Sequence, residues 1–359
     1  MREAYGFLAN NYHPGDAILL FGFSRGAYTA RAVCGLVCRL GVLTKRGMDD
    51  FYDVYRDYRA GRLRDAAHVA ALHARAGGAC VTPDVAVAAI GCFDTVGALG
   101  IPTLPIPYVG RALSGVANAG RHAFHDTGLS ARVQHAFHAL ALDEARAPFA
   151  PALWRRDAAN TATVLRQCWF PGVHTNVGGG YPDQEIADMT LAWMVARTRH
   201  LLDWDTAYVR SAGAAGAGEW AAGRIYNSRR GIMRLAGTQP RTPGAYAAAG
   251  EDTGECVHVS VRVRRQLLPG WAGGALRGWA WSERERAWTC AGRALSEDWL
   301  SPLEMELAGR DIVENLLGWA FPDTSRSATP PGAGEFGGRE SIGYYDSEKA
   351  ASEAVEADK

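Results

Sequence analysis

AILLFGFSRGAYTAR, residues 17–31, joins a short apolar run to a helical pattern through a tight glycine-flanked turn. A continuous apolar run such as Ala17 to Phe21 is typical of a strand buried on both faces. The small residues from Ala27 to Leu40 favour a helix. Strand, turn and helix in this order are the opening unit of a parallel α/β sheet.

The turn at residues 22–26 has the form Gly-x-Ser-x-Gly, which in this setting predicts a nucleophile elbow. We expect the sharp turn to strain the backbone of Ser24, and Gly22 and Gly26 to avoid Cβ collisions. The Arg25 N–H, at the helix N-terminus, is the expected oxyanion donor. The Arg25 side chain is expected to form a buried pair with an acid, and contact with a substrate phosphate is the alternative. The alternative is an ordinary strand-to-helix turn.

Further strand and helix patterns follow along the chain. They predict a mostly parallel α/β sheet flanked by helices. Segment 97–120 is rich in Pro and Gly and is predicted to run over the surface, with His122 and His125 close to it. Buried strands are predicted at 85–93 and 163–170, helices at 2–12, 49–76, 130–143 and 183–202, a loop at 211–223, and a strand at 256–265.

Two polar residues follow the ends of the later buried strands. Asp94 ends the second strand, and His174 comes just after the third. A serine alcohol needs a base, and the base needs an orienting acid. Ser24, Asp94 and His174 stand in the chain order of α/β-hydrolase triads, and strand ends meet at one sheet edge. The alternatives are a turn cap for Asp94 and a backbone-bonded loop histidine for His174.

Several other residues are reserve or supporting candidates. His135 and His138 stand three apart in a predicted helix, which we interpret as a satisfied helix face and not as metal ligands. His138 is the reserve general base. Asp183 is the predicted N-cap of the next helix and the reserve acid. Gly178 begins a Gly-Gly-Gly-Tyr run predicted to pass close to the site beside His174.

Composition narrows the function classes. The 359 residues carry 38 Lys+Arg and 38 Asp+Glu, so there is no basic excess for holding nucleic acid or anionic lipid by bulk charge. No apolar run approaches the roughly 18 residues that span a bilayer, so no stable membrane insertion is expected. No signal-peptide pattern is seen, which favours a cytoplasmic protein. Seven scattered cysteines without a C-x-x-C pair predict reduced thiols, and no metal or cofactor is expected.

The C-terminal third has a different character. Residues 267–320 hold six of the eleven tryptophans, which predict a small core in preference to a lipid-contacting surface. The acidic end is predicted to be a disordered tail. The expected domains are therefore 1–265, an α/β-hydrolase-like domain; 266–324, a Trp-rich extension; and 325–359, the tail.

Four stretches of the chain carry a family resemblance: FGFSRGAYTAR (21–31), CFDTV (92–96), HALALDE (138–144) and WFPGVHTNVGGGY (169–181). Together they resemble the DUF2235 family, which includes the catalytic domain of Tle1-type type VI secretion phospholipase effectors. The resemblance covers roughly residues 2–265 and implies an α/β-hydrolase fold with a serine esterase or phospholipase mechanism acting on carboxylic esters, phospholipid acyl esters included. It assigns the family's serine, aspartate and histidine to Ser24, Asp94 and His174.

One departure from the family concerns the start of the chain. The family resembled carries an Asp-Gly-Thr strand and further strands before the serine, whereas 23 residues precede Ser24 here. We expect an N-terminally truncated sheet with an open edge beside Ala17 to Phe21, and no second oxyanion loop. An incomplete, inactive hydrolase that serves as an interaction module is therefore the alternative function. A metal-dependent phosphate-ester hydrolase is disfavoured because the sequence shows no ligand cluster.

Overall fold

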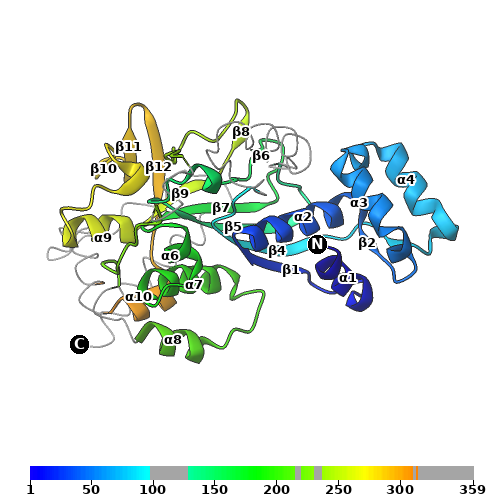
Figure 1. Ribbon diagram of the computed structural model, residues 1–359, viewed down its shortest axis with the longest axis horizontal. Helices are drawn as coiled ribbons and strands as arrows, with labels where there is room; N and C mark the ends of the chain where they lie inside the picture. The colour runs from blue at the N-terminus through cyan, green and yellow to red at the C-terminus, as the bar shows by residue number, and fades with distance from the viewer. Residues whose placement is uncertain (98–127, 215–219, 230–236, 310–312, 314–359) are drawn as a thin grey trace, which may run out of the picture. The chain divides into compact units, whose positions relative to one another are not determined.

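The computed structural model describes residues 1–97, 128–214, 220–229, 237–309 and 313 (Figure 1). The predicted surface segment, with His122 and His125, and the predicted tail lie outside these residues. The chain packs as two compact units, each built from three segments. Unit 1 comprises Met1–Leu140, Glu144–Gln167 and Asn227–Glu255; unit 2 comprises Ala141–Asp143, Cys168–Tyr226 and Cys256–Lys359.

The central element is a mostly parallel eight-stranded sheet flanked by helices, with the order β1-β4-β5-β7-β9-β12-β11-β10. The α/β fold predicted from the alternation of strand and helix patterns is confirmed. β1 stands at one end of the order, so its outer edge pairs with no strand of the described chain. The strands are β1 (Leu19–Phe23), β2 (Val42–Leu43), β3 (Val81–Thr82), β4 (Val87–Phe93), β5 (Val133–Ala141), β6 (Arg156–Asp157), β7 (Val164–Phe170), β8 (Glu251–Asp252), β9 (Glu255–His258), β10 (Ala280–Ser282), β11 (Ala287–Cys290) and β12 (Arg293–Asp298).

The helices form where small or amphipathic runs leave the strands. In unit 1, α2 packs against β1 and β4 (Figure 1). A Cβ at Gly35 would lie 2.1 Å from the Tyr58 hydroxyl, so glycine lets α3 approach α2 closely. The α-helices are α1 (Arg2–Asn11), α2 (Arg25–Leu40), α3 (Phe51–Arg59), α4 (Ala66–Ala74), α6 (His174–Gly178), α7 (Glu185–Thr198), α8 (Thr206–Ala214), α9 (Ser260–Leu267) and α10 (Pro302–Ala308).

The three strands predicted around the site are present as β1, β4 and β7. β1 pairs in parallel with β4, and Phe23 lies opposite Phe93. β4 in turn pairs in parallel with β5. Six of the seven β4 residues are buried, which explains the continuous apolar run that marks this strand in the sequence.

The predicted helix at 130–143 was wrong, because most of this segment is the strand β5. β5 lies inside the sheet order, between β4 and β7. A strand buried on both faces shows no polar alternation, and a short apolar run cannot be told from a helix by periodicity. His135 and His138 therefore do not share a helix face.

Two weaker predictions also need correction. The strand expected at 256–265 ends at His258, and α9 begins at Ser260. The loop expected at 211–223 begins with the last turn of α8, which extends to Ala214. In both places a short element changes type within a few residues, which periodicity over a longer window cannot reveal.

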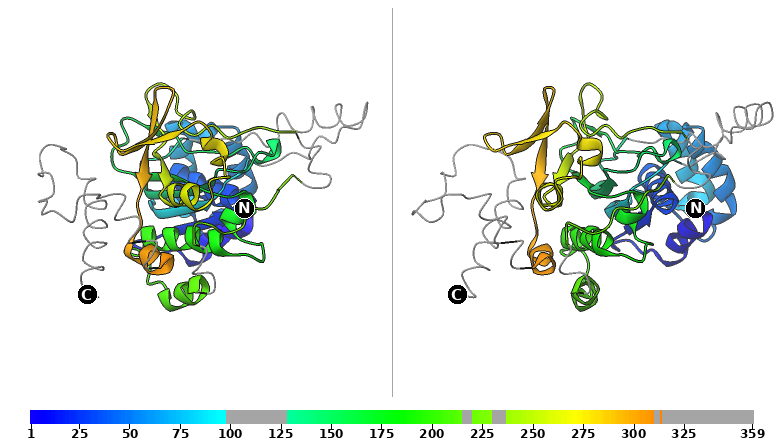
Figure 2. Two further views of the ribbon diagram at one scale, coloured as in Figure 1. Left: turned by 90° about the vertical axis from the view of Figure 1, so that its left-hand side faces the viewer. Right: turned by 60° about the vertical axis from the view of Figure 1, so that its left-hand side comes forward.

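The tryptophan-rich part of unit 2 packs around arginines. Trp279, Trp288 and Trp299 are buried, as the interpretation of a core requires. The Arg262 guanidinium lies 4.5 Å from the Trp281 ring centroid and 5.6 Å from that of Trp299. β11 and β12 pair as an antiparallel hairpin (Figure 2). Within the described chain, no helix is long and apolar enough to cross a membrane.

Candidate active site

Ser24 occupies the turn between β1 and α2. Its backbone has φ 59° and ψ −121°, a region that non-glycine residues rarely adopt. Its N–H donates to the Phe93 carbonyl at 3.0 Å, and its own carbonyl accepts from the Tyr28 N–H at 3.1 Å. Strain of this kind costs of order 1–3 kcal/mol and persists only where the surroundings enforce it.

The two glycines of the turn differ in what they permit. A Cβ at Gly22 would lie 2.6 Å from the Ala27 N and from the carbonyl atoms of Gly26. Because these are backbone atoms, only glycine fits at position 22. At Gly26 a Cβ would meet nothing within 4 Å, so the collision expected there was wrong. Arg25 is exposed, so the expected buried pair was also wrong.

Asp94 follows β4 and is fully buried, with φ 42°. Its N–H donates to the Ala139 carbonyl at 2.7 Å. Both carboxylate oxygens accept from Arg241, Oδ1 from Nη1 and Oδ2 from Nη2 at 2.8 Å. Arg241 also donates to the Phe149 carbonyl at 3.0 Å. Since Phe23 and Phe93 pair directly, unit 1 brings Ser24 and Asp94 to the same edge of adjacent strands.

The backbone that follows Asp94 is held by His138, the reserve base. The Thr95 N–H donates to His138 Nε2 at 2.9 Å. His138 Nε2 therefore accepts, and Nδ1 carries the proton toward Gln167 Oε1 at 3.1 Å. Burial lowers the pKa of His138 to about 3, so its imidazole is neutral at ordinary pH. In this structure His138 is a positioning group within unit 1.

Gln167 fixes the ring of His138, which in turn binds the Thr95 N–H. Its Oε1 also accepts from the Trp154 N–H at 2.8 Å. Its Nε2 donates to the carbonyls of Trp154 and Thr253, at 2.8 and 2.7 Å. All four bonds are buried, so the network fixes one orientation of the His138 ring.

His174 is the first residue of α6 and is buried, four residues after the end of β7. Asn176 holds this short helix. Its Oδ1 accepts from the N–H groups of Val173 and Tyr226, and its Nδ2 donates to the Arg224 carbonyl. Gly178 is the last residue of α6. His174 belongs to unit 2, whereas Ser24 and Asp94 belong to unit 1.

A second carboxylate belongs to the same unit as His174. Asp143 follows β5, and its Oδ2 accepts from the Gly172 N–H at 2.7 Å. Its own N–H donates to the Gly172 carbonyl at 2.9 Å. Its Oδ1 accepts from Trp271 Nε1 at 3.0 Å. Asp143 is thus fixed to the backbone two residues before His174.

Asp183 does not cap the next helix, contrary to expectation. α7 begins at Glu185, and its N-cap is Gln184. The Asp183 carboxylate instead accepts from the Tyr226 hydroxyl, whose ring stacks on Tyr181 at 4.0 Å. Gly179 and Gly180, just before Tyr181, adopt positive φ, which lets the chain turn sharply after α6.

Sequence reasoning missed Arg241 and the role of Asp143. Arg241 stands in a region without clear periodicity, and nothing in its neighbours marks it as a counterion. Asp143 could have been found from the sequence, because it follows the apolar run that forms β5. Had that run been interpreted as a strand, a carboxylate at its end would have been a site candidate.

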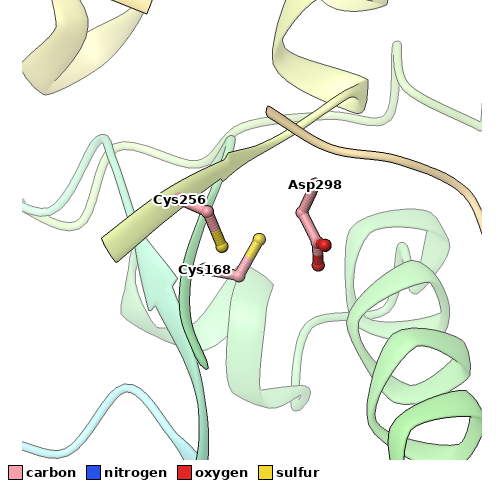
Figure 3. A group of neighbouring side chains, drawn as sticks. All are labelled: Cys168, Cys256 and Asp298. Atoms are coloured by element: carbon pink, nitrogen blue, oxygen red, sulfur yellow. The ribbon is translucent and has the colours of Figure 1, made fainter. Parts of the chain in front are cut away.

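Three buried ligand-type side chains of the described chain come together in unit 2. Potential ligand atoms of Cys168, Cys256 and Asp298 lie within 4.8 Å of one another (Figure 3). Asp298 already accepts from Trp193 Nε1 at 2.7 Å and from Arg197 at 2.6 Å. Burial raises the pKa of the Cys168 thiol well above its usual range. A neutral thiol and an arginine-paired carboxylate do not fit a zinc site, which needs thiolates and four ligands.

A comparison with known protein families matches residues 1–197 with the catalytic domain of Tle1-like phospholipase effectors of the type VI secretion system. The chain belongs to this family. The match covers more than half of the sequence and contains Ser24, Asp94 and His174.

A curated relative is much longer than this chain. The uncharacterized protein YEL023C of Saccharomyces cerevisiae is 29% identical over 153 residues, which cover 41% of this chain. The chain spans 20% of the yeast protein's length. No solved structure matches.

Proposed function

We propose that this chain is a serine hydrolase that cleaves carboxylic esters, with phospholipid acyl esters as the substrate class. Ser24 is the nucleophile, His174 the general base, and Asp94 the orienting acid. The observation that carries the proposal is the strained Ser24 backbone between β1 and α2, which has the features of a nucleophile elbow. The family match to phospholipase effectors supports the substrate class.

The proposed reaction proceeds in two halves. Ser24 Oγ attacks the acyl carbonyl as His174 takes its proton, giving a tetrahedral oxyanion. His174 then protonates the leaving alcohol, and an acyl-enzyme remains. Water attacks the acyl-enzyme, His174 again accepts the proton, and the carboxylic acid leaves with Ser24 restored.

The oxyanion would be stabilised from the start of α2. The Arg25 N–H lies in the first turn, where helix N–H groups lack partners within the helix and the dipole favours negative charge. Gly22 lets the turn close against the backbone of Gly26 and Ala27 at the start of α2. Gly26 is the second residue of α2, and Gly178 is the last residue of α6.

The orienting acid has two candidates in the structure. Asp94 is the acid of the sequence prediction, and it shares a sheet edge with Ser24. Arg241 donates to each of its two carboxylate oxygens. Asp143 is the second candidate, because its carboxylate is bonded two residues before His174 in the same unit.

A fluorophosphonate probe tests the nucleophile. We expect one adduct, on Ser24, in intact-mass and peptide analysis. Ser24→Ala abolishes labelling and esterase activity without loss of fold, and His174→Ala prevents labelling because the alcohol is no longer deprotonated. Labelling elsewhere, or none on a folded sample, contradicts the proposal and favours the interaction-module alternative.

Two isosteric amide variants test which of the two carboxylates, Asp94 or Asp143, orients the imidazole of His174. Replacing the orienting acid by its amide costs roughly 10⁴-fold in kcat because the imidazole tautomer is no longer fixed. Asp94→Asn and Asp143→Asn are compared on a soluble ester, with circular dichroism as the check of fold. A loss of this size in Asp94→Asn alone supports the proposed triad. The same loss in Asp143→Asn alone transfers the role to Asp143.

A further inference from the structure

We propose that the loop Leu267–Trp271 docks this protein on an anionic phospholipid surface. The loop begins at Leu267, the last residue of α9, which is yellow in Figure 1. The inference rests on the proposed function for the identity of the partner, because a phospholipid-cleaving enzyme must work at a lipid interface. Its physical basis is independent of the chemistry at Ser24 and lies entirely in unit 2.

The loop presents two neighbouring leucines to solvent. Leu267 is 48% exposed and Leu268 is 36% exposed. Pro269 and Gly270 are exposed as well, and the Trp271 N–H closes the turn on the Leu268 carbonyl at 2.9 Å. A single exposed leucine is ordinary, but two adjacent ones on a closed turn form an apolar tip.

The apolar tip is held in place by its own neighbours. Trp271 Nε1 donates to Asp143, and the Arg264 guanidinium lies 5.3 Å from the Trp271 ring centroid. Arg264 in turn donates to the carbonyls of Ala221 and Gly223, at 2.8 and 2.7 Å. A tip held in this way loses little conformational entropy when it enters a lipid surface.

The carboxylate that binds Trp271 also binds the segment that carries His174, the proposed base. Asp143 accepts from Trp271 on one oxygen and from the Gly172 N–H on the other. Gly172 stands two residues before His174. One carboxylate therefore joins the apolar tip to the chain that carries His174.

The charge around the tip fits anionic lipid. Residues 260–282 contain four arginines and no acidic residue. Arg262 pairs with Glu297, whereas Arg277 is exposed close to the loop in sequence. Anionic head groups attract basic residues by about 1 kcal/mol each near a membrane surface. Arg264 and Arg265 donate to backbone carbonyls, so Arg277 is the exposed cation of this stretch. Two exposed leucines with an exposed arginine nearby fit a shallow interfacial contact, distinct from a membrane-spanning segment.

Vesicle sedimentation tests the proposal on the full-length protein. Sucrose-loaded vesicles of phosphatidylcholine with one-quarter phosphatidylglycerol are compared with pure phosphatidylcholine vesicles. We expect Leu267→Ser/Leu268→Ser to bind the anionic vesicles at least about tenfold more weakly, since two apolar side chains no longer leave water. Hydrolysis of a soluble ester should keep its wild-type kcat/KM.

Tyr208→Ser is the matched control. Tyr208 is 67% exposed in the same unit but lies on α8, outside the loop. We expect it to bind vesicles like the wild type. Equal loss in both variants, unchanged binding in the leucine variant, or no binding by the wild type would overturn the proposal. Conversion of a dimer to a monomer by the leucine variant, without a change in vesicle binding, would assign the tip to a second copy and overturn it as well.

The outcomes distinguish this inference from the proposed function. Vesicle binding that depends on Leu267 and Leu268 supports the docking role even if no ester is cleaved, in which case the proposed chemistry fails. Ester cleavage by a protein whose vesicle binding does not depend on Leu267 and Leu268 would support the proposed chemistry and overturn the docking role.

Discussion

Asp94 carries a buried negative charge whose counterion, Arg241, comes from 147 residues further along the chain. The side chains are 0% and 1% exposed, so water cannot replace either partner. At this scale the structure adds a partner that no local pattern reveals. His138 shows the same effect, because its ring is fixed by Gln167 from another strand.

Removing the arginine should destabilise unit 1 strongly. Arg241→Met leaves the Asp94 charge buried without its counterion, which costs about 3–5 kcal/mol. Arg132→Met is the control, since Arg132 pairs with Asp84 at the surface and such pairs contribute at most about 1 kcal/mol. Urea unfolding measures both. Similar losses in the two variants would mean that Asp94 is not charged in the folded protein.

The neutral imidazole of His138 predicts a pH dependence of stability. Its pKa falls from 6.5 to about 3 on folding, so the unfolded chain takes up the proton first as the pH is lowered. The stabilisation is complete above about pH 6.5 and is lost toward pH 3, at about 1.4 kcal/mol per pH unit.

His138→Gln should remove this dependence. The difference between its free energy of unfolding and that of the wild type is followed by urea titration between pH 6.5 and 4.5. We expect the wild type to lose stability faster on acidification, by up to about 1.4 kcal/mol per unit. If the free energies of unfolding of the two proteins changed with pH in parallel, His138 would have to be protonated or exposed in the folded protein.

At the scale of elements, the join between β1 and α2 depends on one glycine. The Gly-x-Ser-x-Gly pattern does not distinguish its two glycines, but neighbouring backbone atoms pack closely only against Gly22. In β5, by contrast, the local pattern does not identify the element at all. Its apolar run has no periodicity of its own, and its place inside the sheet order decides that it is a strand.

Alanine at each glycine separates these roles. Gly22→Ala must move backbone by several tenths of an ångström and should cost about 2–4 kcal/mol. Gly26→Ala meets open space on a helix and should be neutral or stabilising by up to about 1 kcal/mol. Thermal unfolding monitored by circular dichroism compares the two. A turn that tolerates both substitutions would contradict the packing described here.

For the whole molecule, the chain passes repeatedly between the two units. β5, β7 and β9 each contain residues of both. Unit 1 takes its last segment from Asn227–Glu255, which holds Arg241 and the carbonyl of Thr253 that Gln167 binds. The family match ends at residue 197, before this segment.

A fragment of residues 1–197 should therefore fail to fold. It lacks the counterion of Asp94 and one acceptor of the Gln167 network, and it exposes the strand edge that β9 covers in the full chain. We expect no cooperative thermal transition in the fragment, while the full-length chain melts cooperatively. A fragment with a sharp transition and dispersed amide resonances would show that the family segment is an independent domain.

The sequence by itself determined the elements whose signals are local. β1 and β4 are continuous apolar runs, β7 ends in the apolar residues Cys168 to Phe170, and the turn at Ser24 is marked by its glycines and the helix that follows. The same local patterns placed Ser24 and Asp94 at strand ends. The register of β1 against β4 then brought those ends together.

Only the tertiary structure decided which groups hold these residues. The Arg241 counterion, the neutral state of His138 and the attachment of Asp143 to Gly172 join residues that lie 147, 43 and 29 positions apart. No short-range pattern specifies such pairs, because their energy arises from burial and from the geometry of elements packed in three dimensions. The leucines at the end of α9 belong to the same class, since the folded chain leaves them exposed.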